Sequence, residues 1–129
     1  MEDLNHIMLV EDEPDIREIA TIALADLGGF TVTACDSAKQ ALEKVEHSRP
    51  QLILLDVMMP DMDGPSTFEE LKKTSIGKTT PVIFMTARAQ THEIKEYLRL
   101  GAIGVITKPF DPSMLKSEII KIWSTREVV

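Results

Sequence analysis

Five polar residues of this sequence have the types that phosphoryl transfer to a side chain requires. They are three acids, a hydroxyl and a lysine: Glu11, Asp12, Asp56, Thr86 and Lys108. Three acids near one point would repel one another unless a cation lies among them, and hard oxygen ligands are what Mg²⁺ prefers. A carboxylate can accept a phosphoryl group covalently, while a lysine and a hydroxyl hold the phosphoryl oxygens. If folding brings the five together, they predict Mg²⁺-dependent phosphorylation of Asp56.

Asp56 ends an apolar run whose surroundings indicate its place in a fold. Residues 52–55 are all Leu or Ile, and the run is bounded by Pro50 and Pro60. Such a run predicts a strand buried on both faces, as in a parallel sheet covered by helices. In open parallel sheets, ligands bind beyond the carboxyl ends of the strands. We therefore expect Asp56 at that edge of a sheet.

Three further apolar runs end in the other four polar groups. The runs 7–10, 81–85 and 105–106 are followed respectively by Glu11 with Asp12, by Thr86 and, after Thr107, by Lys108. A fifth run, residues 30–35, alternates threonines with apolar residues and predicts a half-exposed strand at or near a sheet edge. Because the carboxyl ends of parallel strands point the same way, all the polar groups can meet at one rim.

Helical patterns alternate with the five predicted strands. The first begins at Pro14, ends at Gly28 and has apolar residues at helical spacing: Ile16, Ile19, Ala20, Ala23, Leu24 and Leu27. The next three begin near Ser37 (or Asp36), Pro65 and Thr91, and the fourth helix, residues 91–100, has only a thin apolar stripe. A fifth opens at residues 111–112 and carries Leu115, Ile119 and Ile122 on one face. We therefore expect an α/β fold: a doubly wound (βα)5 parallel sheet with right-handed crossovers.

Length and composition indicate a single globular domain spanning residues 1–129, with residues 1–5 loosely ordered. The chain is 43% hydrophobic and carries 21 acidic against 14 basic residues, a net charge of -7. This charge repels phosphate backbones and anionic lipid, so we expect no nucleic-acid or membrane partner. The single cysteine, Cys35, excludes an internal disulfide, and neither an anchor nor a signal peptide is visible. We expect a cytoplasmic protein.

Four segments of the chain resemble the signature segments of two-component response-regulator receiver domains. They are residues 9–13 (LVEDE), 54–64 (LLDVMMPDMDG), 85–87 (MTA) and 107–110 (TKPF). The segments occur in the order and at the spacing of that family, and the match covers nearly the whole chain. The resemblance implies a flavodoxin-like sheet in the order 2-1-3-4-5.

The resemblance also implies a role for each polar residue. Asp56 matches the phosphoacceptor, and Asp12 matches the acid that binds Mg²⁺ directly. Glu11 would act mainly through water, and the Met58 backbone carbonyl would complete the protein ligands. At the other side of the site, Thr86 matches the hydroxyl that turns toward the phosphoryl group. Lys108 matches the lysine that contacts this group, and its bond to Pro109 is cis in the family.

One position departs from the family pattern. Val105 stands three residues before Lys108, where the family usually has Tyr, Phe or His. In the family this aromatic ring turns inward as the threonine moves. A valine cannot make that rotation, so we expect the signal to reach the surface of the fourth and fifth helices differently or more weakly.

The sequence predicts a phosphorylation-activated signalling switch. The resemblance implies a sensor histidine kinase or phosphotransfer protein as phosphodonor, and a downstream protein bound by the face of the fourth helix, fifth strand and fifth helix. We expect catalysis only of the protein's own phosphorylation and dephosphorylation, with no output domain after the fifth helix. We also expect a monomer or a phosphorylation-linked dimer.

Two other functions compete with this prediction. An interaction domain that works without phosphorylation is favoured if Val105 uncouples the surface. A Mg²⁺-dependent phosphatase with an aspartyl-phosphate intermediate agrees less well with the sequence, because Met58 stands where such enzymes have a second acid.

Ile120, Trp123 and Tyr97 would form an apolar docking patch if they are exposed. Trp123 could instead pack at the rim of the core.

Overall fold

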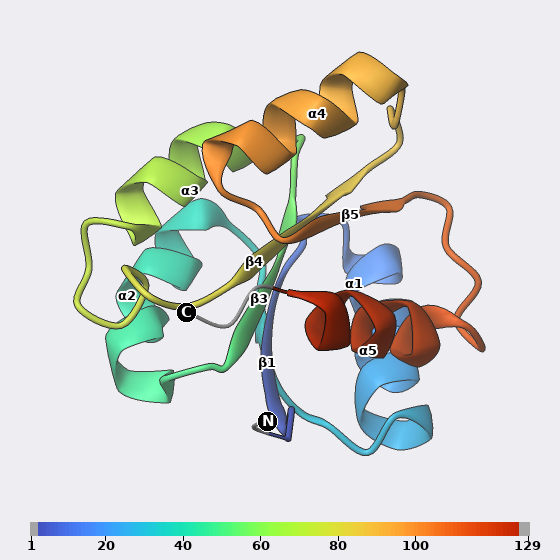
Figure 1. Ribbon diagram of the computed structural model, residues 1–129. Helices are drawn as coiled ribbons and strands as arrows, with labels where there is room; N and C mark the ends of the chain where they lie inside the picture. Colours follow the sequence, from blue (N-terminus) through green and yellow to red (C-terminus); the bar gives the residue numbers. More distant parts are fainter. Residues whose placement is uncertain (1–2, 127–129) are drawn as a thin grey trace.

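The computed structural model describes residues 3–126 and forms a five-stranded parallel sheet. Its strands are β1 (His6–Val10), β2 (Thr31–Cys35), β3 (Leu52–Asp56), β4 (Val82–Thr86) and β5 (Gly104–Thr107). Their order across the sheet is β2-β1-β3-β4-β5, with helices between successive strands (Figure 1). The predicted doubly wound fold and its strand order are therefore confirmed.

The helices cover both faces of the sheet. They are α1 (Pro14–Thr21), which continues as a π-helix, η1 (Ile22–Leu27), then α2 (Ala38–Ser48), α3 (Gly64–Leu71), α4 (Thr91–Leu100) and α5 (Leu115–Thr125). Figure 1 shows α1 and α5 on one side of the sheet and α2, α3 and α4 on the other. Each face of the central strands is thus shielded from water, as their unbroken apolar runs require.

Side chains of the central strands alternate between two hydrophobic clusters. Ile7 and Leu9 of β1 pack on the side of α1 and α5, whereas Met8 and Val10 pack on the side of α2 and α3. All residues of β3 and β4 are buried. The edge strand β2 is half-exposed, as its alternating threonines predict.

The apolar residues of the first helix are only partly buried. Ala20, Ala23 and Leu24 lie in the core, but Ile19 is 47% exposed and Leu27 is 65% exposed. Ile19 therefore lies outside the inward-facing stripe. The wider π-helical turns end at Gly28 and leave Leu27 facing solvent. The helical spacing of these apolar residues is therefore confirmed, but it does not by itself place Ile19 and Leu27 in the core.

The inward face of α5 also differs from the prediction. Leu115 and Ile119 are buried, but the third core residue is Trp123, which is 4% exposed, while Ile122 is only partly buried. Trp123 packs on the α1 and α5 side of the sheet, whereas Tyr97 packs on the α2 and α3 side. Of the two alternatives for Trp123, packing at the core is therefore the one that the structure has, and the docking patch of Ile120, Trp123 and Tyr97, which required exposure, is not formed.

Two further expectations concern weakly held parts of the chain. No residue of α4 is buried, which agrees with its thin apolar stripe. Of residues 1–5, expected to be loosely ordered, 1 and 2 lie outside the described residues; Leu4 is 8% exposed, and the Asn5 backbone N–H donates to Gln51 Oε1 (2.7 Å). Within residues 3–126, no helix has the length and apolar character needed to cross a membrane.

Candidate functional site

The strand register places the predicted polar residues at one edge of the sheet. Val10 pairs with Leu55, and Asp56 pairs with Met85, so the carboxyl ends of β1, β3 and β4 are level. Beyond these ends come the two acids that follow β1, while Thr86 ends β4 and pairs with Thr107 of β5. Residues separated by up to about a hundred positions therefore lie together because the strands are parallel and in register.

Three carboxylates and one lysine form the centre of this rim. One oxygen each from Glu11, Asp12 and Asp56 lies within 4.8 Å of the other two. The Lys108 Nζ is 2.5 Å from Glu11 Oε1 and 3.1 Å from Asp56 Oδ1. Glu11 is fully buried and Asp56 is 4% exposed, so these charges interact with little solvent between them.

Burial and mutual repulsion shift the ionisation of the central groups. Burial, followed by the charge and hydrogen bond of Glu11, raises the pKa of Asp56 from 3.8 to about 7, although Lys108 opposes the rise. Burial lowers the pKa of Lys108, but hydrogen bonding and attraction to Glu11 and then Asp56 outweigh it, so its net pKa is raised. One ammonium group thus leaves the three acids with excess negative charge.

The donor set fits a magnesium ion. Its oxygens are carboxylates, which Mg²⁺ prefers, and their separation allows them to share one cation. Glu11 Oε1 is buried and, apart from its ion pair with Lys108, makes no hydrogen bond with the described residues. Burial and then the charge of Glu11 raise the pKa of Asp56, and a cation bound among the acids would oppose that rise.

Arg17 holds the acidic corner between β1 and α1. Its Nη1 donates to the backbone carbonyl oxygens of Glu11 (2.9 Å) and Asp12 (3.3 Å). The Glu13 backbone N–H donates to Glu11 Oε2 (3.2 Å). Sequence reasoning missed Arg17, which stands one turn into α1 among exposed residues and has no distinguishing pattern of its own.

The loop after β5 places Lys108 in the site. The Lys108–Pro109 peptide bond is cis, as the resemblance implies. The Lys108 backbone N–H donates to the Thr86 carbonyl oxygen (2.8 Å), which continues the pairing of β4 with β5. The Lys108 side chain then reaches the acids and is only 14% exposed.

Thr86 is buried, and its hydroxyl is bonded to its own loop. The Arg88 backbone N–H donates to Thr86 Oγ1 (3.0 Å), and this hydroxyl donates to the Arg88 carbonyl oxygen (3.2 Å). Thr86 also lines the cavity onto which Asp56 opens. Its hydroxyl therefore lies beside the site but is hydrogen-bonded to the Arg88 backbone.

A cavity of about 380 Å³ gives access to these groups. Its lining residues come from the carboxyl ends of β3 and β4, from the loops after four strands and from the start of α1: Asp12, Glu13, Ile16, Asp56, Met58, Thr86, Ala87, Lys108 and Pro109. Met58 is 70% exposed at the mouth, and its backbone N–H donates to Asp56 Oδ1 (3.4 Å). The cavity can admit a small anionic group to the Asp56 carboxylate.

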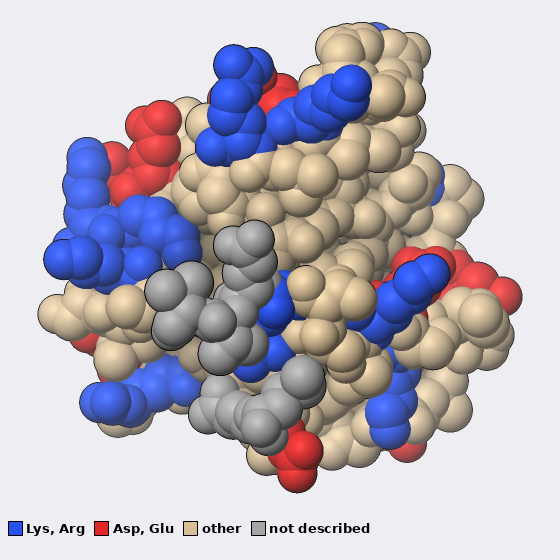
Figure 2. Space-filling view, in the orientation of Figure 1, with Lys and Arg blue, Asp and Glu red and all other residues tan. Residues whose placement is uncertain are grey.

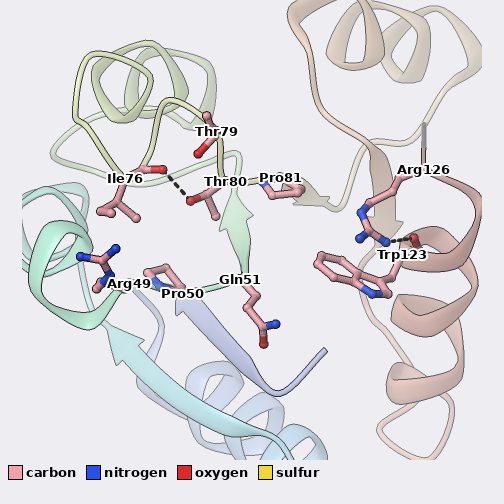
Figure 3. A pocket seen from close by; sticks show the side chains of 9 residues that line it. All are labelled: Arg49, Pro50, Gln51, Ile76, Thr79, Thr80, Pro81, Trp123 and Arg126. Atoms are coloured by element: carbon pink, nitrogen blue, oxygen red, sulfur yellow. Dashed lines mark hydrogen bonds between the residues drawn. The ribbon is translucent and has the colours of Figure 1, made fainter. Parts of the chain in front are cut away.

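A second cavity of about 370 Å³ lies at the opposite edge of the sheet (Figure 3). It is lined by Arg49, Pro50, Gln51, Ile76, Thr79, Thr80, Pro81, Trp123 and Arg126, which include no carboxylate. Several of its polar side chains have partners: the Gln51 amide binds the backbone of residues 3, 5 and 6, and Arg126 lies over the Trp123 ring and donates to the Trp123 carbonyl oxygen. Figure 2 shows several groups of Lys and Arg on the facing surface, although the chain has a net charge of -7.

The sheet order and the acid- and lysine-lined rim define a flavodoxin-like α/β protein with one candidate site at the carboxyl edge. The family model of the response regulator receiver domain matches residues 7–120. The chain therefore belongs to the response regulator receiver family, and the resemblance inferred from the four segments is confirmed.

Relatives and solved structures agree with this assignment. The chain is 40% identical over 119 residues to the transcriptional regulatory protein CseB of Streptomyces coelicolor, which covers 92% of the chain and 49% of CseB. It is 34% identical over 111 residues to the response regulator Rre1 of Synechocystis, covering 86% of the chain and 48% of Rre1. The chain spans about half the length of these relatives. The chemotaxis protein CheY4 of Vibrio cholerae superposes with a TM-score of 0.84 at 28% identity, over 93% of this chain and 99% of CheY4.

Proposed function

We propose that the protein is a phosphorylation-activated switch in which Asp56 accepts a phosphoryl group from a histidine kinase or a phosphotransfer protein. The observation that carries this proposal is the cluster of Asp56 with two further acids within 4.8 Å and with the Lys108 ammonium 3.1 Å away. Membership of the receiver family supports the same function. In the transfer, an Asp56 carboxylate oxygen attacks phosphorus, the phosphorus–nitrogen bond of the phosphohistidine breaks, and the neutral or protonated imidazole leaves.

Magnesium would be held by Glu11, Asp12, Asp56 and the Met58 backbone carbonyl. When bound, it supplies positive charge that neutralises the acids and the phosphoryl oxygens. The side chain of Lys108 keeps the Asp56 carboxylate paired and can then neutralise a phosphoryl oxygen, because its Nζ already lies 3.1 Å from Asp56 Oδ1. The Thr86 hydroxyl can donate to another phosphoryl oxygen if it leaves Arg88.

Output would take place through protein contacts. Phosphorylation adds about -1.5 to -2 charge and three acceptor oxygens at the rim, enough to change the balance between two arrangements of a neighbouring loop. A downstream protein would bind the face formed by α4, β5 and α5, to the monomer or to a phosphorylation-linked dimer. The switch would catalyse only its own phosphorylation and dephosphorylation.

The proposal is tested by measuring the intact mass of the protein after incubation with acetyl phosphate and Mg²⁺. We expect one phosphoryl adduct that is absent after chelation of the metal and absent in Asp56→Asn. Asp26→Asn is the matched control, because it makes the same change at an exposed acid remote from the rim. A folded wild-type protein that gains no adduct, or an adduct that persists in Asp56→Asn, would disprove the assignment.

An interaction domain that works without phosphorylation is the second candidate. Val105 of β5 favours it, because this partly buried side chain is aliphatic and cannot make the aromatic rotation expected of the family. The candidates are separated by comparing backbone-amide NMR spectra of the protein with and without the phosphoryl adduct. Spectral changes confined to the rim would favour the second candidate, and changes that reach α4 and α5 would favour the switch.

A further inference from the structure

Asp61 joins the loop between β3 and α3, residues 57–63, to the amino end of α2. Its carboxylate accepts hydrogen bonds from two backbone N–H groups: Oδ1 from Ala38 (3.4 Å) and Oδ2 from Lys39 (3.2 Å). These are the first two residues of α2, and the N–H groups of a first helical turn have no acceptor within the helix. A carboxylate is favoured there, because the amino end of a helix carries partial positive charge.

Helix α2 already has a local cap that does not involve Asp61. The Ser37 hydroxyl accepts from the Gln40 backbone N–H (3.1 Å). Gln40 Oε1 in turn accepts from the Asp36 backbone N–H (2.8 Å). Asp61, by contrast, reaches α2 from a loop 22 positions further along the chain. What its contact adds is therefore a fixed position for the loop that carries it.

The same loop carries the Met58 backbone to the candidate site. The Met58 backbone N–H donates to Asp56 Oδ1 (3.4 Å). Met58 is 70% exposed, so its side chain does little to hold the loop. The Met58 carbonyl is also the one proposed magnesium ligand that does not belong to a side chain. Its position therefore depends on the conformation of the loop.

Asp61 gives the loop a directional contact. Backbone hydrogen bonds hold the ends of the loop at Val57 and Gly64, and between them Met59 is buried in the hydrophobic cluster on the α2 and α3 side. Hydrophobic packing is non-directional, whereas a hydrogen bond weakens steeply as its angle closes. The two bonds of Asp61 therefore restrict the direction of the backbone three residues after Met58.

We propose that Asp61 is a positioning residue that fixes the loop of residues 57–63 against α2 and so holds the Met58 backbone carbonyl in place for magnesium. This inference rests on the proposed function, in which that carbonyl is a metal ligand. Asp61 is not one of the three clustered acids and does not line the cavity at Asp56. It acts through the loop and not by contact with the metal.

The test is a titration with Mg²⁺, followed by backbone-amide NMR, of the wild-type protein, Asp61→Ala and Asp61→Asn. Asp61 is exposed, so neither substitution leaves a buried cavity. Both remove the charge, but Asn keeps one oxygen that can accept a hydrogen bond from α2. Ser37→Ala is the matched control, because it removes a different cap from the same end of α2 and leaves the bonds of Asp61 in place.

We expect Asp61→Ala to weaken Mg²⁺ binding about threefold, the factor typical of an exposed carboxylate at a helix amino end. Asp61→Asn should lie between wild type and Asp61→Ala, and Ser37→Ala should bind as the wild type does. Equal binding by wild type and Asp61→Ala would overturn the inference. An equal loss in Ser37→Ala would also overturn it, because stability of α2 alone would then explain the effect. Equal losses in Asp61→Asn and Asp61→Ala would assign the effect to charge and not to position, with the same consequence.

Hydrogen exchange of single amides in the metal-free protein gives a readout that does not depend on bound metal. In Asp61→Ala we expect the Met58 amide to exchange about threefold faster, because the loop has lost its contact with α2. The Gln40 amide, which has a different acceptor, should keep its wild-type rate. An unchanged Met58 amide would show that Asp61 serves α2 alone and would refute the proposed role.

The two measurements separate failure of this inference from failure of the proposed function. A wild-type protein that binds no Mg²⁺ would reject the proposed metal site and this role of Asp61 together. Mg²⁺ binding that is equally tight in wild type, Asp61→Ala and Asp61→Asn would reject the role of Asp61 and leave the metal site standing.

Discussion

Replacing Asp56 by Asn is expected to stabilise the metal-free protein at about pH 8. Burial and Glu11 raise the pKa of Asp56 from 3.8 to about 7, so ionising this carboxyl opposes folding. At 1.36 kcal/mol for each pKa unit, ionisation of Asp56 lowers the free energy of unfolding by about 4 kcal/mol. Because Asp56 opens onto a cavity that admits water, screening reduces the expected effect to about 2 kcal/mol. Asn has nearly the shape of the carboxyl and carries no charge, which removes this opposition.

The effect of pH on this difference has a definite sign. In the unfolded chain, Asp56 loses its proton near its ordinary pKa of 3.8, whereas the folded chain keeps it until about pH 7. Between these values folding takes up a proton, so the stability of the wild-type protein falls as the pH rises and stays low above about pH 7. The advantage of Asp56→Asn should therefore be small near pH 4 and complete at about pH 8.

Urea unfolding followed by circular dichroism, in the presence of a chelator, measures the difference. Wild type, Asp56→Asn and the control Asp26→Asn are compared at about pH 5 and about pH 8. Addition of Mg²⁺ at the higher pH should stabilise the wild-type protein more than Asp56→Asn. The reasoning is refuted if Asp56→Asn is no more stable than wild type at about pH 8, or if its advantage is the same at both pH values.

Three further predictions concern the same part of the fold. Lys108→Met should lower the free energy of unfolding by about 3 kcal/mol, because buried Glu11 loses its ion pair; an unchanged urea midpoint would contradict this. Gly64→Ala should cost about 1–3 kcal/mol, because the added Cβ would lie 2.9 Å from the Asp56 backbone oxygen. Thermal melting checks this cost, and wild-type stability would show that the close contact is absent. Cys35 should resist iodoacetamide in the folded protein, because burial raises its pKa to about 11; equal rates in buffer and in urea would count against it.

Much of the fold and the site could be predicted because the relevant signals are local. The unbroken apolar run before Asp56 requires a strand covered on both faces, and its position in the chain requires helices on either side. Parallel strands then bring their carboxyl ends together, so the meeting of Asp56 with Glu11, Asp12 and Lys108 follows from the order of the runs. The resemblance to receiver domains added the strand order and the cis peptide bond, both of which the structure contains.

The packing of the helices could not be predicted in the same way. Helical spacing groups residues into a stripe but does not fix how the stripe is rotated against the sheet. On α5 that rotation buried Trp123 and left Ile122 partly exposed, and on the first helix it left Ile19 at the surface. These outcomes depend on which side chains fill the space between helix and sheet, which is decided by close packing of the whole domain.

The sequence alone determined that the chain forms a doubly wound parallel sheet with an acidic, lysine-containing rim, because apolar runs and their polar ends are properties of neighbouring residues. Only the tertiary structure decided which distant groups hold that rim in place. Arg17 contacts the carbonyl oxygens of Glu11 and Asp12, and Tyr97 reaches β4 from α4. Neither has a signal in the sequence, since each role depends on the distance and direction between side chains that folding brings together.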